Sequence, residues 1–227
     1  MIKPKKSLGQ NFLIDNNIIR KIIDCGDIKN NPVLEIGPGT GNLTKEIIKH
    51  IKNDLILIEK DAGLIDEIKN IKSVYNIDII NIDILKFDIE KQIKPNTIIF
   101  GNLPYNISTQ ILVKLIKFNN WPPKYNKLVL MFQKEVADRI ISKYNTSNFG
   151  RISVIVKSRL ELIDSFDITR NCFYPKPKVD STVLVFKPLD NKISKDIDLN
   201  TLEKITHIFF SNKRKMINKA FKKLFKD

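Results

Sequence analysis

Short apolar runs alternate with amphipathic stretches along most of the chain. The runs predict buried strands at Pro32–Ile36, Leu55–Glu59, Asn76–Asp83, Thr97–Gly101, Lys127–Phe132, Ile152–Arg159 and Ser181–Lys187. Between several of them, apolar residues recur at helical spacing, which predicts helices at Lys45–Ile51, Asp61–Ile71 and Ser108–Lys117. Because strands alternate with helices, the pattern predicts an α/β fold with a mostly parallel sheet covered on both faces.

The pattern changes near residue 190. The segment Asn191–Asn200 is polar and charged and is typical of a linker, whereas Thr201–Phe225 has a helical pattern with a dense basic stretch. We therefore predict a main α/β domain over residues 1–190 and a small helical, basic segment over residues 191–227. That segment is too short for a large core of its own, so we expect it to pack on the main domain.

The chain carries 39 Lys and Arg against 25 Asp and Glu, a net charge of +14. This excess favours a polyanionic partner. Only six of the 39 are Arg, and the chain is also rich in Ile and Asn, so part of the charge reflects composition bias. No window approaches the ~18 uninterrupted apolar residues of a membrane span, and the basic N-terminus lacks a signal-peptide pattern. We expect a soluble, cytoplasmic protein.

The cysteines and histidines are isolated from one another along the chain. Their spacing matches no zinc motif and no disulfide framework. We therefore expect no metal site and assign no chemistry to Cys25, Cys172, His50 and His207.

A glycine-rich turn follows the first predicted strand. Its spacing is G-x-G-x-G at Gly37, Gly39 and Gly41, and Asn42 stands where the dinucleotide fingerprint has Gly or Ala. Pro38 removes a backbone N–H, which disfavours a pyrophosphate cradle. The turn suits a ligand without phosphate, such as S-adenosylmethionine; the plain alternative is a tight turn that binds nothing.

Two acidic residues end the next two predicted strands. Glu59 lies 22 residues past Gly37, where a carboxylate can accept hydrogen bonds from both hydroxyls of a ribose. Asp83 ends the third strand, where a carboxylate can accept from an adenine amino group. Together with the glycine turn they predict a nucleoside-binding edge of the sheet.

The strand at Thr97–Gly101 runs into an Asn-Leu-Pro-Tyr loop at the same predicted edge. The lone pair of an adenine N6 is delocalised into the ring, so this amine is a poor nucleophile. If its two N–H groups donate to the Asn102 side-chain oxygen and to a loop carbonyl such as that of Leu103, the lone pair can face a methyl donor. Tyr105 offers a stacking face for a flipped base, and Pro104 stiffens the loop. The alternative is an ordinary turn between strand and helix.

At this point the motifs match a known family along nearly the whole chain. The sequence resembles the ribosomal RNA adenine N6,N6-dimethyltransferases, in particular the bacterial small-subunit (16S) enzymes. The matching segments, in chain order, are 7–13 (SLGQNFL), 35–41, Glu59, Asp83, 101–109, 133–136 (QKEV), 149–154 (FGRISV), 173–181 (FYPKPKVDS) and 210–216.

The resemblance implies a Rossmann-like, S-adenosylmethionine-dependent methyltransferase that acts on small-subunit ribosomal RNA in the immature 30S subunit. It implies that Phe173 stacks on the target base opposite Tyr105. The implied cofactor contacts are Asn11, Leu13, Gly37, Glu59, Asp83 and Asn102. The basic loop with Lys176 and Lys178 and the cluster Lys213, Arg214 and Lys215 are the implied RNA contacts. No sequence feature asks for a second copy, so we expect a monomer.

Three other interpretations differ from a small-subunit RNA methyltransferase in their substrate or in their class of protein. Large-subunit RNA methyltransferases are close relatives, but Leu103 and Asp180 favour the small-subunit branch. A non-catalytic assembly factor with the same fold and a DNA methyltransferase with the same loop chemistry are the others. The family usually has paired arginines where Lys213 and Arg214 stand, and it usually continues for several further helices. This resemblance therefore predicts an incomplete C-terminal domain, which would affect ribosome docking more than cofactor binding.

Overall fold

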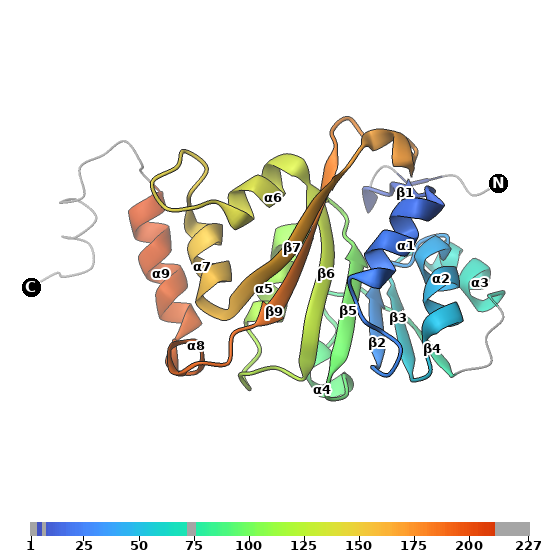
Figure 1. The fold of residues 1–227 in the computed structure, drawn as a ribbon, viewed down its shortest axis with the longest axis horizontal. Helices are drawn as coiled ribbons and strands as arrows, with labels where there is room; N and C mark the ends of the chain where they lie inside the picture. The colour runs from blue at the N-terminus through green and yellow to red at the C-terminus, as the bar shows by residue number, and fades with distance from the viewer. Residues whose placement is uncertain (1–3, 6–7, 72–75, 212–227) are drawn as a thin grey trace, which may run out of the picture.

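The fold is built on one seven-stranded sheet with helices on both faces (Figure 1). A computed structural model describes residues 4–5, 8–71 and 76–211. The sheet strands are β2 (Val33–Ile36), β3 (Leu55–Glu59), β4 (Ile77–Asn81), β5 (Thr97–Asn102), β6 (Tyr125–Gln133), β7 (Leu160–Ile168) and β9 (Ser181–Pro188). A separate two-stranded sheet pairs β1 (Phe12–Leu13) with β8 (Phe173–Tyr174). The helices are α1 (Asn16–Asp24), α2 (Asn42–His50), α3 (Ala62–Lys69), α4 (Ile89–Gln92), α5 (Ser108–Ile116), α6 (Lys134–Ile141), α7 (Arg151–Arg159), α8 (Lys192–Asp196) and α9 (Leu199–Phe210).

The strand order places the glycine turn next to the Asn-Leu-Pro-Tyr loop. The order is β4-β3-β2-β5-β6-β9-β7, with parallel pairing from β4 to β6 and antiparallel pairing of β9 with both β6 and β7. The chain moves outward from β2 to β4 and then returns to β5 on the other side of β2. In open parallel sheets, such a reversal leaves a crevice at the carboxyl ends of the two central strands. The predicted mostly parallel α/β fold is confirmed.

Alternating residues of the central strands feed two apolar layers. On β2, Val33 packs with α1, α2 and α3, whereas Leu34 and Ile36 pack with α4, α5, α6 and α7. Because successive side chains of a strand point to opposite faces, continuous apolar runs such as VLEI and LILIE are typical of strands buried on both sides. Figure 1 shows α1, α2 and α3 gathered on one face of the sheet.

The strand predicted at Ile152–Arg159 is wrong. These residues belong to α7, which begins at Arg151, and the true strand β7 starts at Leu160. β-branched residues at 152, 154, 155 and 156 suggested a strand. In the folded chain Ile155 and Val156 pack into the core, and the Ser153 hydroxyl accepts from the Gly150 N–H at the start of the helix. Tertiary packing therefore overrides β propensity here.

The predicted linker at Asn191–Asn200 is also partly helical. It contains α8 and the first residues of α9, because Asn191 and Asp198 cap these helices by accepting backbone N–H groups. The predicted C-terminal helix is confirmed up to Phe210, and α9 packs on α7. The basic stretch from Asn212 onward lies outside the described residues, and the domain boundary near 190 stays a prediction. None of the described helices is long and apolar enough to cross a bilayer.

Candidate active site

A pocket of about 310 Å³ opens at the carboxyl ends of β2, β3 and β5. That volume is within the range of small-molecule sites. Three segments far apart in sequence line it: the N-terminal loop, the glycine turn and the Asn-Leu-Pro-Tyr loop. Of the residues predicted to bind the cofactor, all six line this pocket: Asn11, Leu13, Gly37, Glu59, Asp83 and Asn102.

The glycine turn needs glycine for two separate reasons. Gly37 has φ +69°, a conformation that L side chains rarely adopt, and a Cβ there would face open space beside the Asn102 carbonyl. Gly39 has φ +59°, and a Cβ there would lie 2.9 Å from the Phe12 ring. The turn therefore brings bare backbone to the pocket floor while the N-terminal loop packs over it.

Glu59 is fixed by backbone donors on both oxygens. Its Oε2 accepts from the Gly39 N–H at 3.1 Å and its Oε1 accepts from the Asp61 N–H at 2.8 Å. Burial raises the pKa of this carboxyl, and the two backbone hydrogen bonds oppose that rise. Each oxygen keeps a further lone pair, so the carboxylate can accept two ribose hydroxyls from the pocket side.

Asp83 lines the pocket but is already engaged. It lies two residues beyond β4, where its Oδ1 accepts from the Leu85 N–H at 3.0 Å and its Oδ2 pairs with the Lys60 ammonium at 2.8 Å. The hydrogen bond from Lys60 is the main cause that lowers the pKa of Asp83. The group is therefore an ionised acceptor held at the rim of the pocket.

The N-terminal loop holds the Asn102 side chain. The Asn102 Nδ2 donates to the Asn11 carbonyl at 3.0 Å, and the Asn42 Nδ2 donates to the Leu13 carbonyl at 2.8 Å. Because its amide nitrogen is bonded to this loop, the Asn102 Oδ1 is left as an acceptor without a partner among the described residues. In the sequence, Asn42 stands out only as a departure from the dinucleotide fingerprint, and this bond to the Leu13 carbonyl is not predicted.

The ionisable side chains of the pocket suit a ligand without phosphate. They are the acids Glu35, Glu59 and Asp83 and one ammonium, that of Lys60. Within the described part of the chain, no group of three His, Cys, Asp or Glu side chains is placed to hold a metal ion. The carboxylates of Glu59 and Asp83 suit ribose hydroxyls, an adenine amino group and the positive charges of S-adenosylmethionine.

Residues 1–227 match the ribosomal RNA adenine dimethylase family over their whole length. The chain belongs to this family. It is 49% identical to the ribosomal RNA small subunit methyltransferase A of Pelagibacter ubique (strain HTCC1062), over 99% of this chain and 85% of that protein. It is 41% identical to the protein of the same name from Malacoplasma penetrans (strain HF-2), over 97% of this chain and 78% of that one.

A solved structure agrees with this membership. The crystal structure of a dimethyladenosine transferase from Plasmodium falciparum superposes with a TM-score of 0.79 and 31% identity, covering 93% of this chain and 74% of that one. The Rossmann-like methyltransferase fold predicted from the sequence is therefore confirmed.

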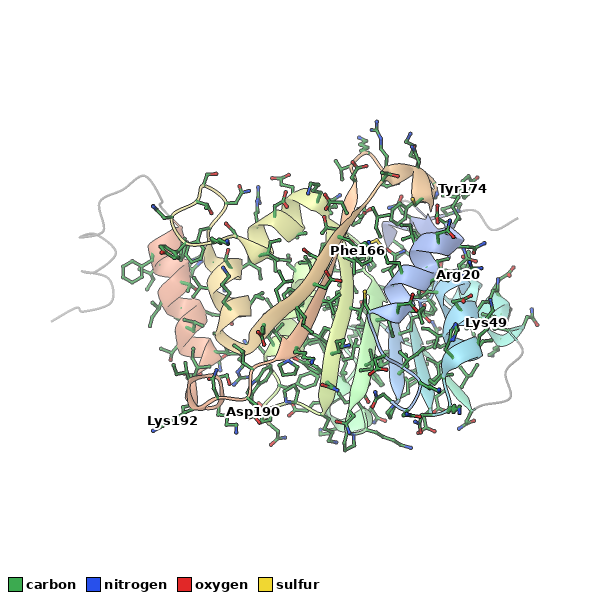
Figure 2. The ribbon with its side chains drawn as sticks, in the orientation of Figure 1. Arg20, Lys49, Phe166, Tyr174, Asp190 and Lys192 are labelled. Carbon is green, nitrogen blue, oxygen red and sulfur yellow. The ribbon has the colours of Figure 1, made fainter. Side chains whose placement is uncertain are left out.

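Phe173, the aromatic that the resemblance to the adenine dimethylases places against the target base, is not among the residues that line the pocket. It is 3% exposed and pairs with Leu13 in the β1–β8 sheet, within the core that also holds Phe12. Its neighbour Tyr174 is 55% exposed and points away from the body of the molecule (Figure 2). Stacking by Phe173 stays a prediction, and it requires this ring to leave its present contacts.

The other residues predicted for the reaction lie together. Asn102, Leu103, Pro104 and Tyr105 all line the pocket in one loop. The loop is closed by a hydrogen bond from the Ile107 N–H to the Pro104 carbonyl at 3.1 Å. Lys176 and Lys178 are exposed on the loop between β8 and β9, whereas Lys213, Arg214 and Lys215 lie outside the described residues.

Sequence reasoning missed the residues that fasten the N-terminal loop. Asp61 begins α3 as its cap, and its carboxylate accepts from the Lys5 ammonium at 2.6 Å and from the Gln10 side-chain amide at 2.8 Å. Lys5 and Gln10 thus bind next to Glu59, on the side of the pocket that holds the predicted ribose acceptor. An aspartate at a helix cap two residues after Glu59 was the available signal, but its partners are about 50 residues away in sequence.

Glu35 is a second buried acid of the pocket. It is 2% exposed and accepts from the Thr44 hydroxyl at 2.7 Å. Burial, aided by the nearby Glu59, raises the pKa of Glu35 from 4.5 to about 8, against the lowering effect of Thr44. The group is therefore neutral in the folded protein over much of the range where an exposed glutamate is ionised.

We expect this acid to make the ligand-free protein less stable as the pH rises. Between pH 6 and pH 8 the unfolded chain holds an ionised Glu35 and the folded chain a protonated one. Since the unfolded state binds fewer protons, the free energy of unfolding falls by about 1.4 kcal/mol per pH unit, roughly 2 kcal/mol in all. Glu35→Gln keeps an acceptor for Thr44 and should remove this loss. Denaturant unfolding at both pH values measures it, with Glu67→Gln, an exposed acid of α3, as control; equal pH dependence in wild type and Glu35→Gln would refute the assignment.

Proposed function

We propose that this chain transfers methyl groups from S-adenosylmethionine to N6 of adenines in small-subunit ribosomal RNA. We further propose that it acts as a cytoplasmic monomer on the immature 30S subunit and dimethylates two adjacent adenines near the 3′ end. Family membership and the names of its relatives support the reaction and the substrate class. The observation that carries the chemistry is the Asn102 amide: the residue lines the pocket and its side-chain nitrogen is held by the Asn11 carbonyl, which leaves its oxygen as the acceptor.

The pocket residues suit the cofactor in a definite order. The Glu59 carboxylate would accept the ribose hydroxyls, Asp83 the adenine amino group, and the bare backbone at Gly37 would lie against the remaining part. When bound, S-adenosylmethionine supplies a methyl group that is already activated by the positive sulfur. The protein therefore needs no metal and no strong base to make the methyl group reactive.

The Asn-Leu-Pro-Tyr loop then acts on the amine. The Asn102 Oδ1 and the Leu103 carbonyl accept the two N6–H groups of the target adenine, which holds the nitrogen lone pair toward the methyl group. With the cofactor held by Glu59 and Asp83, its methyl group would pass to this nitrogen, the cofactor would leave as a neutral thioether, and the nitrogen would lose one proton to water. Tyr105 supports the flipped base by stacking. Positioning and fixed dipoles account for the catalysis in this scheme.

The exposed lysines of the loop between β8 and β9 should hold the RNA backbone. Replacing Lys176 and Lys178 together by alanine is expected to weaken binding of small-subunit RNA about tenfold near 0.15 M salt and to reduce the slope of log affinity against log salt by about 1 to 2. Filter binding over a salt series measures both quantities. Lys29→Ala with Lys52→Ala, two exposed lysines at the opposite edge of the sheet, is the matched control, and an equal loss in control and test would contradict the assignment.

A substrate comparison tests the proposed function. Tritiated S-adenosylmethionine is offered with small subunits that lack adenine dimethylation, with large subunits, or with adenine-rich single-stranded DNA. We expect label in the small-subunit RNA alone. Label in the large subunit or the DNA would replace the proposed substrate. Binding of small subunits without any label would favour an assembly factor that keeps the methyltransferase fold.

A further inference from the structure

The Tyr105 side chain contacts Ser181, which the sequence places at the end of the FYPKPKVDS motif and at the start of a predicted strand. The Tyr105 hydroxyl lies 2.8 Å from the Oγ of Ser181, and the two residues are 76 positions apart. Ser181 is fully buried, whereas Tyr105 is partly exposed and lines the pocket. One end of the tyrosine ring therefore faces the pocket and the other end is bonded to the protein interior.

Ser181 is a rigid anchor because three strands meet at it. It is the first residue of β9, where it pairs with Gln133 of β6 and with Ile168 of β7. The preceding residue, Asp180, is held by two backbone donors. Its side-chain carboxylate accepts from the Arg170 N–H at 2.8 Å, and its backbone carbonyl accepts from the Lys134 N–H at 3.0 Å. A hydroxyl at this position moves little relative to the sheet.

The hydrogen bond with Ser181 constrains the orientation of the Tyr105 ring, on which stacking depends. A tyrosine side chain turns about two torsions, and the hydrogen bond to Ser181 fixes the far end of the Tyr105 ring. Burial raises the pKa of Tyr105, so both partners are neutral hydroxyls at physiological pH. The bond therefore acts on the direction of the ring and not on its charge.

We propose that Ser181 is a positioning residue for methyl transfer: it holds the plane of Tyr105 so that a flipped adenine stacks with N6 at the Asn102 oxygen. This inference rests on the proposed function, and it adds a residue outside the Asn-Leu-Pro-Tyr loop. It also connects recognition of the adenine base with recognition of the RNA backbone, because Ser181 directly follows the loop that contains Lys176 and Lys178.

Two variants remove the same bond from its two ends. Ser181→Ala and Tyr105→Phe are each expected to lower kcat for methyl transfer to undermethylated small subunits about 5- to 10-fold, with the KM for the cofactor unchanged. The double variant should be no slower than either single one, because only one bond is lost. Thr182→Val is the matched control: it removes a buried hydroxyl from the next position of β9, whose partner is Asp167 on β7.

A spectroscopic measurement separates positioning from a purely structural role. The fluorescence of RNA that carries 2-aminopurine at the target adenine should be quenched when the RNA binds the wild type. The quenching should be weaker when it binds Ser181→Ala or Tyr105→Phe. A lower melting temperature with unchanged kcat and quenching, or additive losses in the double variant, would overturn the role of Ser181. If Ser181→Ala does not fold, Tyr105→Phe alone decides. An active wild type with unaffected variants refutes this inference only, whereas an inactive wild type refutes the proposed function and with it this inference.

Discussion

Replacing Asn102 by alanine is expected to lower kcat about 100- to 1000-fold, the range found when one preorganised polar group is removed from a reacting centre. The variant loses the oxygen that accepts an N6–H of the adenine, so the lone pair returns to conjugation with the ring. It also loses the bond from Nδ2 to the Asn11 carbonyl. That loss should weaken cofactor binding only about fivefold, as expected for one neutral hydrogen bond.

Single-turnover methyl transfer with saturating cofactor measures this effect, and RNA binding should remain near that of the wild type. Asn126→Ala is the control, because Asn126 is an exposed asparagine at the start of β6, away from the pocket. A kcat within tenfold of the wild type would show that the amide oxygen does not hold the amine. Equal loss of RNA binding and of rate would assign Asn102 to substrate binding instead.

Replacing Glu59 by glutamine is expected to raise the dissociation constant of the cofactor about 100-fold. An amide has a single acceptor oxygen, so its NH₂ must face the N–H of either Gly39 or Asp61, the two groups that the carboxylate now accepts. One buried backbone donor is then unsatisfied, which costs about 1–3 kcal/mol, and the charge-assisted bonds to the ribose hydroxyls weaken as well.

Calorimetric titration with S-adenosylhomocysteine measures the loss without turnover. Glu67→Gln, which neutralises an exposed acid of the following helix, controls for charge alone. Binding within threefold of the wild type would mean that Glu59 serves the shape of the glycine turn and not the ribose. RNA affinity measured in the absence of cofactor should be the same in all three proteins.

The sequence pattern predicts those parts of the site that lie directly after a single buried strand. The glycine turn, Glu59 and the Asn-Leu-Pro-Tyr loop each follow a buried strand directly, and parallel pairing of β2 with β3 and β5 brings them to one edge. Apolar runs made these strands visible in the sequence. The edge strand β7 was missed, since its outer face is exposed and a register shift between Leu162 and Asp164 breaks the alternation.

The contacts that orient the site come from long-range pairing, which one sequence does not display. The Asn11 carbonyl that holds Asn102 is 91 positions away, and the β1–β8 pairing that buries Phe173 joins two segments of two residues each. Strands of two residues are too short to show the alternation of apolar and polar residues that predicts a strand. The helices α1 and α6 were likewise not predicted, although both present an apolar face to the core.

The most direct test of the account is to map methylated adenines on the RNA. Small subunits lacking adenine dimethylation are incubated with the protein and S-adenosylmethionine, and nuclease fragments of their RNA are analysed by mass spectrometry. The account predicts N6,N6-dimethyladenosine at two adjacent positions near the 3′ end, and none with Asn102→Ala. Unmodified adenines despite cofactor binding by the wild type, or methyl groups on any other base, would contradict it.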